Sequence, residues 1–205
     1  MVVIVLTGGI GSGKSVAAGY FSGRGAFAID LDDVATRLMG PGSALLAAVA
    51  AEFGAHILFA DGSLDRAALA RASFGDADAT RQLDDIVHPA VAREAVSMLV
   101  ELRALSVVPR VVVLEVPLLA EAPGFAELGD LVLAITAPET MRVERAVARG
   151  MERGDVFARV LVQAPDSARV ALADVVIEND GSLEHFTESL GRFWDEKLGA
   201  GTPRE

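Results

Sequence analysis

The sequence predicts an α/β protein in three layers, in which a five-stranded parallel sheet lies between helices. Short, continuous apolar runs recur along the chain, and stretches of helical composition separate most of them. A glycine-rich loop directly follows the first run, as in proteins of this class that bind ligands at the ends of strands. The chain has 205 residues, 52% of them hydrophobic, which is enough for one domain with a substantial core.

Five apolar runs are expected to form buried strands, because uninterrupted runs of this length suit a sheet that is covered on both faces. The predicted strands are residues 2–6, 26–29, 111–114, 131–135 and 175–177. The helical stretches between them predict right-handed crossover connections between parallel neighbours.

The loop after the first strand carries the clearest chemical signal. Residues 8–15 read GGIGSGKS and fit the phosphate-binding pattern G-x-x-x-x-G-K-[ST], with a helix expected over residues 16–21. Glycines allow successive N–H groups to turn toward an anion at a helix N-terminus. Lys14 adds a positive charge for the β- and γ-phosphates, and the Ser15 hydroxyl is expected to ligate Mg²⁺. The predicted contacts to ATP in this P-loop are Gly9, Ile10, Gly11, Ser12, Gly13, Lys14, Ser15 and Val16.

The alternative interpretation is a glycine-rich turn that binds nothing. The complete match to the pattern, placed between a strand and a helix, argues against this alternative.

One connection is too long for a simple crossover. Residues 34–107 separate the second and third strands, and we interpret them as an inserted helical lobe. In enzymes that transfer a phosphoryl group, such a lobe often binds the second substrate, the acceptor of that group. We therefore expect a single P-loop kinase domain over residues 1–205, with its core at about 1–33 and 108–198. A helical lid is expected over residues 139–165.

Composition restricts the partners and the chemistry. The net charge of −11 argues against binding to nucleic acid or to anionic membranes, which both need a basic surface. The absence of cysteine excludes disulfides and thiolate chemistry. No secretory leader and no apolar segment of bilayer length is recognised, so a cytoplasmic location is expected. The oligomeric state is not predicted.

Acidic residues follow two of the predicted strands, at the sheet edge where α/β proteins bind ligands. Asp32 is predicted to orient an acceptor hydroxyl and to take its proton. Asp30 is expected to orient the acceptor or a metal-bound water. Glu115 resembles the acidic residue that ends a Walker-B strand. Asp33 has a competing interpretation, as the cap of a helix that begins near residue 34.

Arginines gather in the segment that follows the fourth strand. Arg142, Arg145 and Arg149 are spaced by three and four residues and therefore share one helix face. A lid that turns arginines toward the phosphates would exclude water and stabilise developing charge, and we favour this role for Arg145 and Arg149. Arg142, with Arg153 and Arg159, fits a solvated face paired with neighbouring glutamates.

His88 precedes Pro89, which is expected to start a new helix at its first position. A lone histidine more often serves structure than catalysis.

These motifs, taken in order, resemble the dephospho-CoA kinase family from about residue 3 to residue 181. The segments that carry the resemblance are LTGGIGSGKS, AIDLDDVATRL, PGS, FG, DGSLDRAAL, Phe74, His88-Pro89, EVPLLAE, Gln163, Arg169 and ADVVIENDG.

The resemblance implies transfer of the ATP γ-phosphate to the ribose 3′-hydroxyl of dephospho-CoA, with Mg²⁺. It implies that Asp32 is the catalytic base and that Lys14 and Arg145 assist transfer. Asn179 and Gly181 are then expected beside the adenine. The residues expected toward the acceptor are Asp30, Asp32, Arg66, His88, Leu118 and Arg169.

Two positions depart from the family pattern. Val16 stands where many members have a threonine, so a hydroxyl for the α-phosphate is missing. Glu115 stands where Asp or an apolar residue is common, and its longer side chain changes the expected metal geometry.

Two other functions remain open from the residues alone. Another small-molecule or nucleoside monophosphate kinase would share the loop and the helical insert. A nucleotide-dependent switch would share the loop, but the chain lacks the N-K-x-D and D-x-x-G motifs of GTPase switches.

Overall fold

The computed structural model describes residues 1–73 and 76–199, and the chain divides into two compact units. The core unit comprises Met1–Asp30 and Leu102–Glu205, and the helical unit comprises Leu31–Glu101. Phe74, one of the residues that carried the family resemblance, lies outside the described residues.

The core unit is built on a five-stranded parallel sheet with the order β2-β3-β1-β4-β5. The strands are β1 (Val2–Thr7), β2 (Phe27–Asp30), β3 (Val111–Glu115), β4 (Leu131–Thr136) and β5 (Val175–Glu178). All five predicted strands are present, so the predicted fold class is confirmed.

Each strand ends one residue later than predicted, and β2 also begins one residue later. The apolar runs stop before these final residues, but backbone pairing continues through polar ones. Asp30 of β2 pairs in register with Glu115 of β3, and Thr136 of β4 pairs with Glu178 of β5. The sheet therefore carries acidic side chains at its carboxyl edge.

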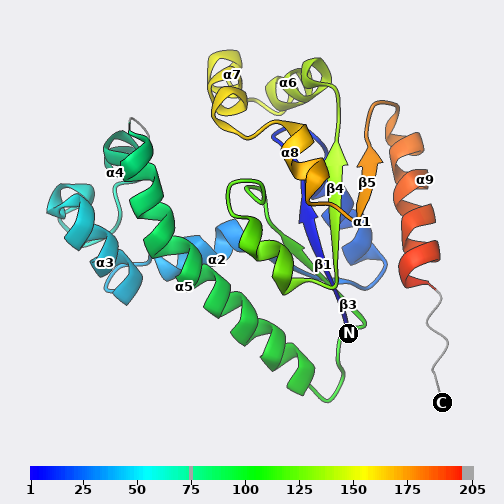
Figure 1. Ribbon diagram of the computed structural model, residues 1–205, viewed down its shortest axis with the longest axis horizontal. Coiled ribbons are helices and arrows are strands. Elements are labelled where there is room, and N and C mark those ends of the chain that lie inside the picture. Colours follow the sequence, from blue (N-terminus) through cyan, green and yellow to red (C-terminus); the bar gives the residue numbers. More distant parts are fainter. Residues whose placement is uncertain (74–75, 200–205) are drawn as a thin grey trace. The chain divides into compact units, whose positions relative to one another are not determined.

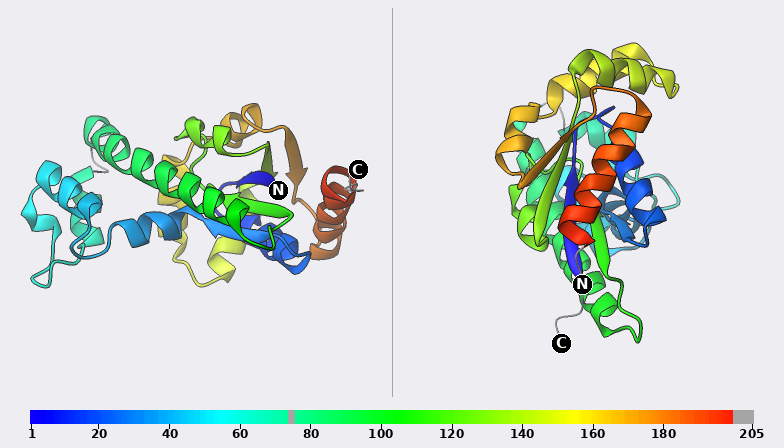
Figure 2. Two further views of the ribbon diagram at one scale, coloured as in Figure 1. Left: turned by 90° about the horizontal axis from the view of Figure 1, so that it is seen from below. Right: turned by 90° about the vertical axis from the view of Figure 1, so that its right-hand side faces the viewer.

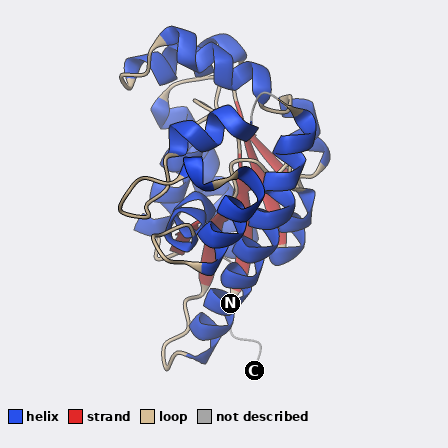
Figure 3. Ribbon diagram, turned by 90° about the vertical axis from the view of Figure 1, so that its left-hand side faces the viewer, coloured by secondary structure: helices blue, strands red, loops and turns tan. Residues whose placement is uncertain are grey.

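Helices cover both faces of the sheet. On one face α1 (Lys14–Gly23) and α9 (Leu183–Phe193) lie side by side, as the right-hand view of Figure 2 shows. Phe21 and Phe186 from these helices pack against Ile4 and Leu133 of the sheet. On the other side of β4 lies α8 (Asp166–Ala171). The strands thus form the middle of three layers. Figure 3 shows the strands in red and the helices in blue.

Two further helices of the core unit follow β4. α6 (Glu139–Ala148) and α7 (Arg153–Val162) lie beyond the carboxyl end of this strand (Figure 1). They pack on each other through Val143, Ala146 and Val156. The remaining short elements of this unit are η2 (Pro123–Leu128) and the π-helical turn η3 (Trp194–Leu198).

The helical unit begins directly where β2 ends. Its elements are α2 (Leu31–Leu38), α3 (Ala44–Phe53), the 3₁₀ turn η1 (Ala55–Ile57), α4 (Arg66–Ser73) and α5 (Ala77–Ala104), whose last residues enter the core unit. A hydrophobic cluster around Val49, Ile57 and Leu69 holds α3, η1 and α4 together. In the described residues, no helix is long and apolar enough to cross a bilayer.

Two sequence-based expectations about helix starts are wrong. α2 begins at Leu31, so Asp33 lies within its first turn, where an acidic side chain complements the helix dipole, and does not cap a later helix. Pro89 lies inside α5. A proline costs a helix interior about 3 kcal/mol. Here apolar contacts on both sides offset that cost, since Ile86 packs on the cluster and Val91 is buried.

Candidate functional site

The loop between β1 and α1 has the backbone conformation of an anion-binding site. Gly11 and Gly13 have φ angles of 76° and 107°, in the left-handed region that favours glycine. The Ser12 N–H donates to the Gly9 carbonyl, which holds the loop in a turn. Other loop N–H groups have no protein acceptor among the described residues, namely those of Gly11, Gly13, Lys14 and Ser15. These donors gather at the N-terminus of α1, where an anion is stabilised.

The loop glycines are also required by close packing. A Cβ at Gly13 would overlap the side-chain amide of Asn179, and a Cβ at Gly9 would overlap the Arg142 guanidinium. At Gly11 a Cβ would lie 2.7 Å from the Arg142 carbonyl carbon and would overlap the carbonyl oxygen. The loop is therefore pressed against α6 and against the segment after β5.

Lys14 is paired with a carboxylate of the neighbouring strand. Its Nζ lies 3.0 Å from Oε2 of Glu115, and the two side chains are 14% and 11% exposed. Sequence reasoning placed both residues near the phosphates but missed this ion pair. The pairing depends on β3 lying beside β1, which the strand order reveals and the sequence does not. A polyphosphate in the loop would compete with Glu115 for the Lys14 ammonium.

Arg145 and Asn179 meet at the phosphate loop. The Arg145 guanidinium donates to the Asn179 backbone carbonyl at 2.8 Å and to its Oδ1 at 3.2 Å. The Asn179 side-chain amide in turn donates to the Ser12 carbonyl at 2.7 Å. Asn179 is buried, and its backbone N–H donates to Thr136 at the end of β4. Two residues predicted for nucleotide binding thus form one chain of contacts that ends in the loop. Gly181, predicted beside them, directly precedes Ser182, the N-cap of α9.

Arg142 corrects the sequence-based interpretation of the arginine row. It was expected on a solvated face, but it is only 7% exposed and its Nη1 lies 3.3 Å from Oδ1 of Asp166. The absence of side chains at Gly9 and Gly11 leaves room for this residue against the loop.

The remaining arginines of the row lie at the surface, namely Arg149, Arg153 and Arg159. Arg153 pairs with Glu144 at 3.0 Å, and both side chains are more than half exposed. This agrees with the solvated face that was expected. Arg149 and Arg159 are exposed, and the predicted contact of Arg149 with ATP stays a prediction.

The residues predicted to bind the acceptor are divided between the two units. In the core unit, Asp30 ends β2, Leu118 is 42% exposed, and Arg169 is 1% exposed. Arg169 donates to the Ala164 carbonyl at 2.7 Å and to Asp166 at 3.2 Å. Its Nη2 also lies 3.7 Å from Oε1 of Glu121, so Arg169 is held both by its own segment and by the residues that follow β3. Its predicted contact with the acceptor stays a prediction.

In the helical unit, Asp32 lies in the first turn of α2, and Arg66 reaches the same helix by donating to Thr36 at 3.1 Å. His88 lies 3.5 Å from Asp84, one turn earlier in α5. The helical unit thus brings Arg66 to the helix that carries Asp32, while His88 lies on a different helix.

The turn before α4 contains a carboxylate with a shifted pKa. The Ser63 hydroxyl donates to Oδ1 of Asp61 at 2.6 Å, and the Ser63 N–H donates to the same oxygen at 2.9 Å. These hydrogen bonds stabilise the charged carboxylate and lower the pKa of Asp61. The side chain is exposed, so this is a local property of the turn.

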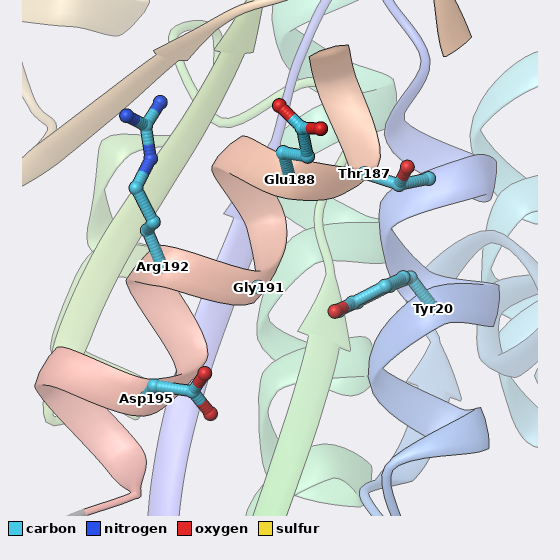
Figure 4. A pocket seen from close by; sticks show the side chains of 6 residues that line it. All are labelled: Tyr20, Thr187, Glu188, Gly191, Arg192 and Asp195. Atoms are coloured by element: carbon cyan, nitrogen blue, oxygen red, sulfur yellow. The ribbon is translucent and has the colours of Figure 1, made fainter. Parts of the chain in front are cut away.

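A separate hollow of about 550 Å³ lies between α1 and α9 (Figure 4). Tyr20 points from α1 toward Gly191, and Thr187, Glu188, Arg192 and Asp195 also line the hollow. Hydrogen bonds to Tyr20 and Asp195 raise the pKa of the nearby Arg24. No residue of the phosphate loop lines this hollow, so it is distinct from the candidate site.

Comparison with known proteins decides the family. A sequence model described as dephospho-CoA kinase matches residues 2–185. The chain belongs to the dephospho-CoA kinase family. The dephospho-CoA kinase of Frankia casuarinae is 40% identical over 198 residues, covering 97% of this chain and 84% of the relative. That of Corynebacterium glutamicum is 42% identical over 191 residues, covering 93% and 96%. The chain spans 48% of the Mycolicibacterium paratuberculosis relative, at 41% identity.

Solved structures share the fold. A crystal structure of a Thermus thermophilus protein matches with a TM-score of 0.76 at 36% identity, covering 97% of this chain and 98% of that one. The dephospho-CoA kinase of Campylobacter jejuni matches with a TM-score of 0.68 at 21% identity, covering 95% and 96%. A shikimate kinase of Acinetobacter baumannii, with a TM-score of 0.54 at 12% identity over 99% and 96%, shares the fold alone. Because it belongs to the dephospho-CoA kinase family, the chain is an enzyme of the kinase class, as predicted.

Proposed function

We propose that this protein transfers the γ-phosphoryl group of ATP to the ribose 3′-hydroxyl of dephospho-CoA. The observation that carries the proposal is the match to the dephospho-CoA kinase family over residues 2–185. The phosphate loop adds a chemical reason, because its unengaged N–H groups and Lys14 form a site for a polyphosphate.

The nucleotide is held by the loop from Gly9 to Val16, in this proposal. On binding, Lys14 exchanges its contact with Glu115 for the β- and γ-phosphates, while the loop N–H groups stabilise the phosphate oxygens. Arg145 in α6 and Arg149 at the C-cap of α6 contribute positive charge. Further contacts come from the segment after β5, at Asn179 and Gly181.

Mg²⁺ fits the residues at this site if phosphates supply most of its ligands. In the part of the chain that the structure describes, no three acidic or histidine side chains form a metal cluster. Ser15 is exposed in the first turn of α1, so its hydroxyl can provide one protein oxygen, and Mg²⁺ commonly retains waters besides. When bound, the ion neutralises charge on the transferred group.

The chemical step needs a base for the acceptor hydroxyl, and we assign this role to Asp32. The 3′-oxygen attacks the γ-phosphorus, the bond from that phosphorus to the ADP oxygen breaks, and the hydroxyl proton passes to the Asp32 carboxylate. The acceptor contacts that we propose are Asp30, Asp32, Arg66, His88, Leu118 and Arg169. The cytoplasmic location and the absence of nucleic acid and membrane partners stay predictions.

The test measures ADP formation by the purified protein with ATP and Mg²⁺. Dephospho-CoA should support turnover, whereas nucleoside monophosphates, small sugars and shikimate should not. Turnover with one of those other acceptors, and none with dephospho-CoA, would refute the proposed substrate. Incubation without any acceptor measures hydrolysis, which a nucleotide-dependent switch would show and a kinase should not.

The role of Asp32 has a matched control in the next residue. Asp32→Asn should lower kcat by roughly 10²- to 10⁴-fold, the range of general-base effects, with little change in ATP affinity. Asp33→Asn removes the same charge from the same helix turn and should retain most turnover. Equal activity of the two variants would show that Asp32 is not the base.

A further inference from the structure

Ile10 is the one apolar side chain within the glycine-rich stretch of residues 8–13. It packs against the hydrophobic cluster that joins α6 and α7, formed by Val143, Ala146 and Val156. Ile10 is partly buried there, so an apolar contact ties the phosphate loop to the α6 and α7 pair.

The backbone of Ile10 is anchored to the same pair. Its N–H donates to Oε1 of Gln163 at 3.1 Å, and Gln163 is the C-cap residue of α7. This N–H is occupied by a protein acceptor, whereas those of Gly11 and Gly13 have no protein acceptor among the described residues. The loop donors are thus divided between a contact with α7 and the phosphate site.

The segment that carries Gln163 is itself held in place. The next N–H, that of Ala164, donates to Oε1 of Glu121 at 2.8 Å. Asp166 then pairs with Arg142, whose backbone packs against Gly11. Contacts on both sides of Ile10 therefore converge on α6, α7 and the residues that follow α7.

We propose that α6 and α7 hold the phosphate loop in place through Ile10, and that Gln163 is a positioning residue for nucleotide binding. The inference rests on the proposed function, since it assumes that the loop receives ATP. Gln163 must be a hydrogen-bond acceptor to fix the Ile10 N–H, and it must be neutral because a carboxylate there would repel the bound phosphates.

Two variants separate these requirements. Gln163→Glu keeps an acceptor for the Ile10 N–H but adds a negative charge, so the melting temperature should hold while the Kd for ATP rises roughly 3- to 30-fold. Added salt should reduce this increase by screening. Gln163→Leu removes the acceptor, so the Kd for ATP should rise roughly threefold or more without that salt dependence.

The matched control is Gln82→Glu, which makes the same change at an exposed position in α5 and should leave the Kd for ATP unchanged. Titration calorimetry with ATP and Mg²⁺ measures the Kd directly, without an acceptor. In steady-state assays the KM for ATP should rise, while the KM for dephospho-CoA and kcat at saturating ATP stay within about twofold. A structural defect alone would lower the fraction of active enzyme, and with it the apparent kcat, but would leave the KM for ATP unchanged.

The inference is overturned if both Gln163 variants bind ATP within twofold of the parent protein, or if Gln163→Glu weakens binding no more than Gln82→Glu does. Failure of the proposed function looks different. In that case the Gln163 variants still show a raised Kd for ATP by calorimetry, but neither they nor the parent protein phosphorylates dephospho-CoA.

Discussion

Replacing Gly11 with alanine should damage both the fold and the nucleotide site. The residue has φ 76°, and a Cβ there would overlap the backbone oxygen of Arg142 in α6. A flexible side chain could move aside, but a helix backbone cannot shift without moving α6. Gly9 differs, because its added Cβ would meet the movable tip of the Arg142 side chain.

The magnitude follows from two costs at Gly11. A left-handed conformation costs a non-glycine residue about 1–2 kcal/mol, and overpacking typically costs about 1–3 kcal/mol. We therefore expect the free energy of unfolding to fall by roughly 3 kcal/mol. In a chain of this length each kcal/mol shifts the melting temperature by about 2–4 °C, so a fall of roughly 6–12 °C is expected.

The matched control lies in the helix that follows the loop. Gly19 sits mid-helix in α1, and a Cβ there would meet nothing within 4 Å. Gly19→Ala should therefore raise the free energy of unfolding by about 0.5–1 kcal/mol. Thermal denaturation and ATP titration of both variants provide the measurement. If Gly11→Ala melts with the parent protein and binds ATP normally, the close approach of the loop to Arg142 is wrong.

Two further substitutions probe the contacts around the site and in the helical unit. Asn179→Ala removes the Oδ1 that accepts from Arg145 and the amide that donates to the Ser12 carbonyl, while the backbone carbonyl of residue 179 can still accept from Arg145. We expect the free energy of unfolding to fall by about 2–4 kcal/mol and the Kd for ATP to rise. Unchanged ATP binding, measured by calorimetry, would show that this contact does not position the loop. Ser43→Ala removes the N-cap of α3, where the hydroxyl accepts from the Leu46 N–H, and should cost about 1 kcal/mol in urea denaturation. Ser43→Asp should recover most of that stability, and failure to do so would contradict the capping role.

The elements predicted correctly from the sequence have local signals. The five strands are marked by apolar runs, and the phosphate loop by a contiguous pattern of glycine, lysine and serine. Lys14 and Ser15 could be placed next to a helix because loop and helix adjoin in the chain, but α1 begins at Lys14, two residues before the predicted start at residue 16. The wrong predictions at Asp33 and Pro89 concern helix starts, where packing of the whole helix outweighs the preference of one residue.

The contacts that shape the candidate site depend on the strand order and on packing. Glu115 could be paired with Lys14 only once β3 was known to lie beside β1. Arg142 looked solvent-exposed because helical spacing shows which residues share a face, but not what covers that face. The bond from Ile10 to Gln163 joins residues 153 positions apart, and no local pattern reveals it.

The central place of β1 in the sheet has a consequence for biosynthesis. Both of its neighbours, β3 and β4, are encoded in the second half of the chain. As the protein emerges from the ribosome, the first strand to be made must therefore wait for its partners. Asn179, which clamps the loop at Ser12, is translated later still. A nascent chain released before that codon would contain the whole phosphate-binding motif and yet lack the clamp that holds it.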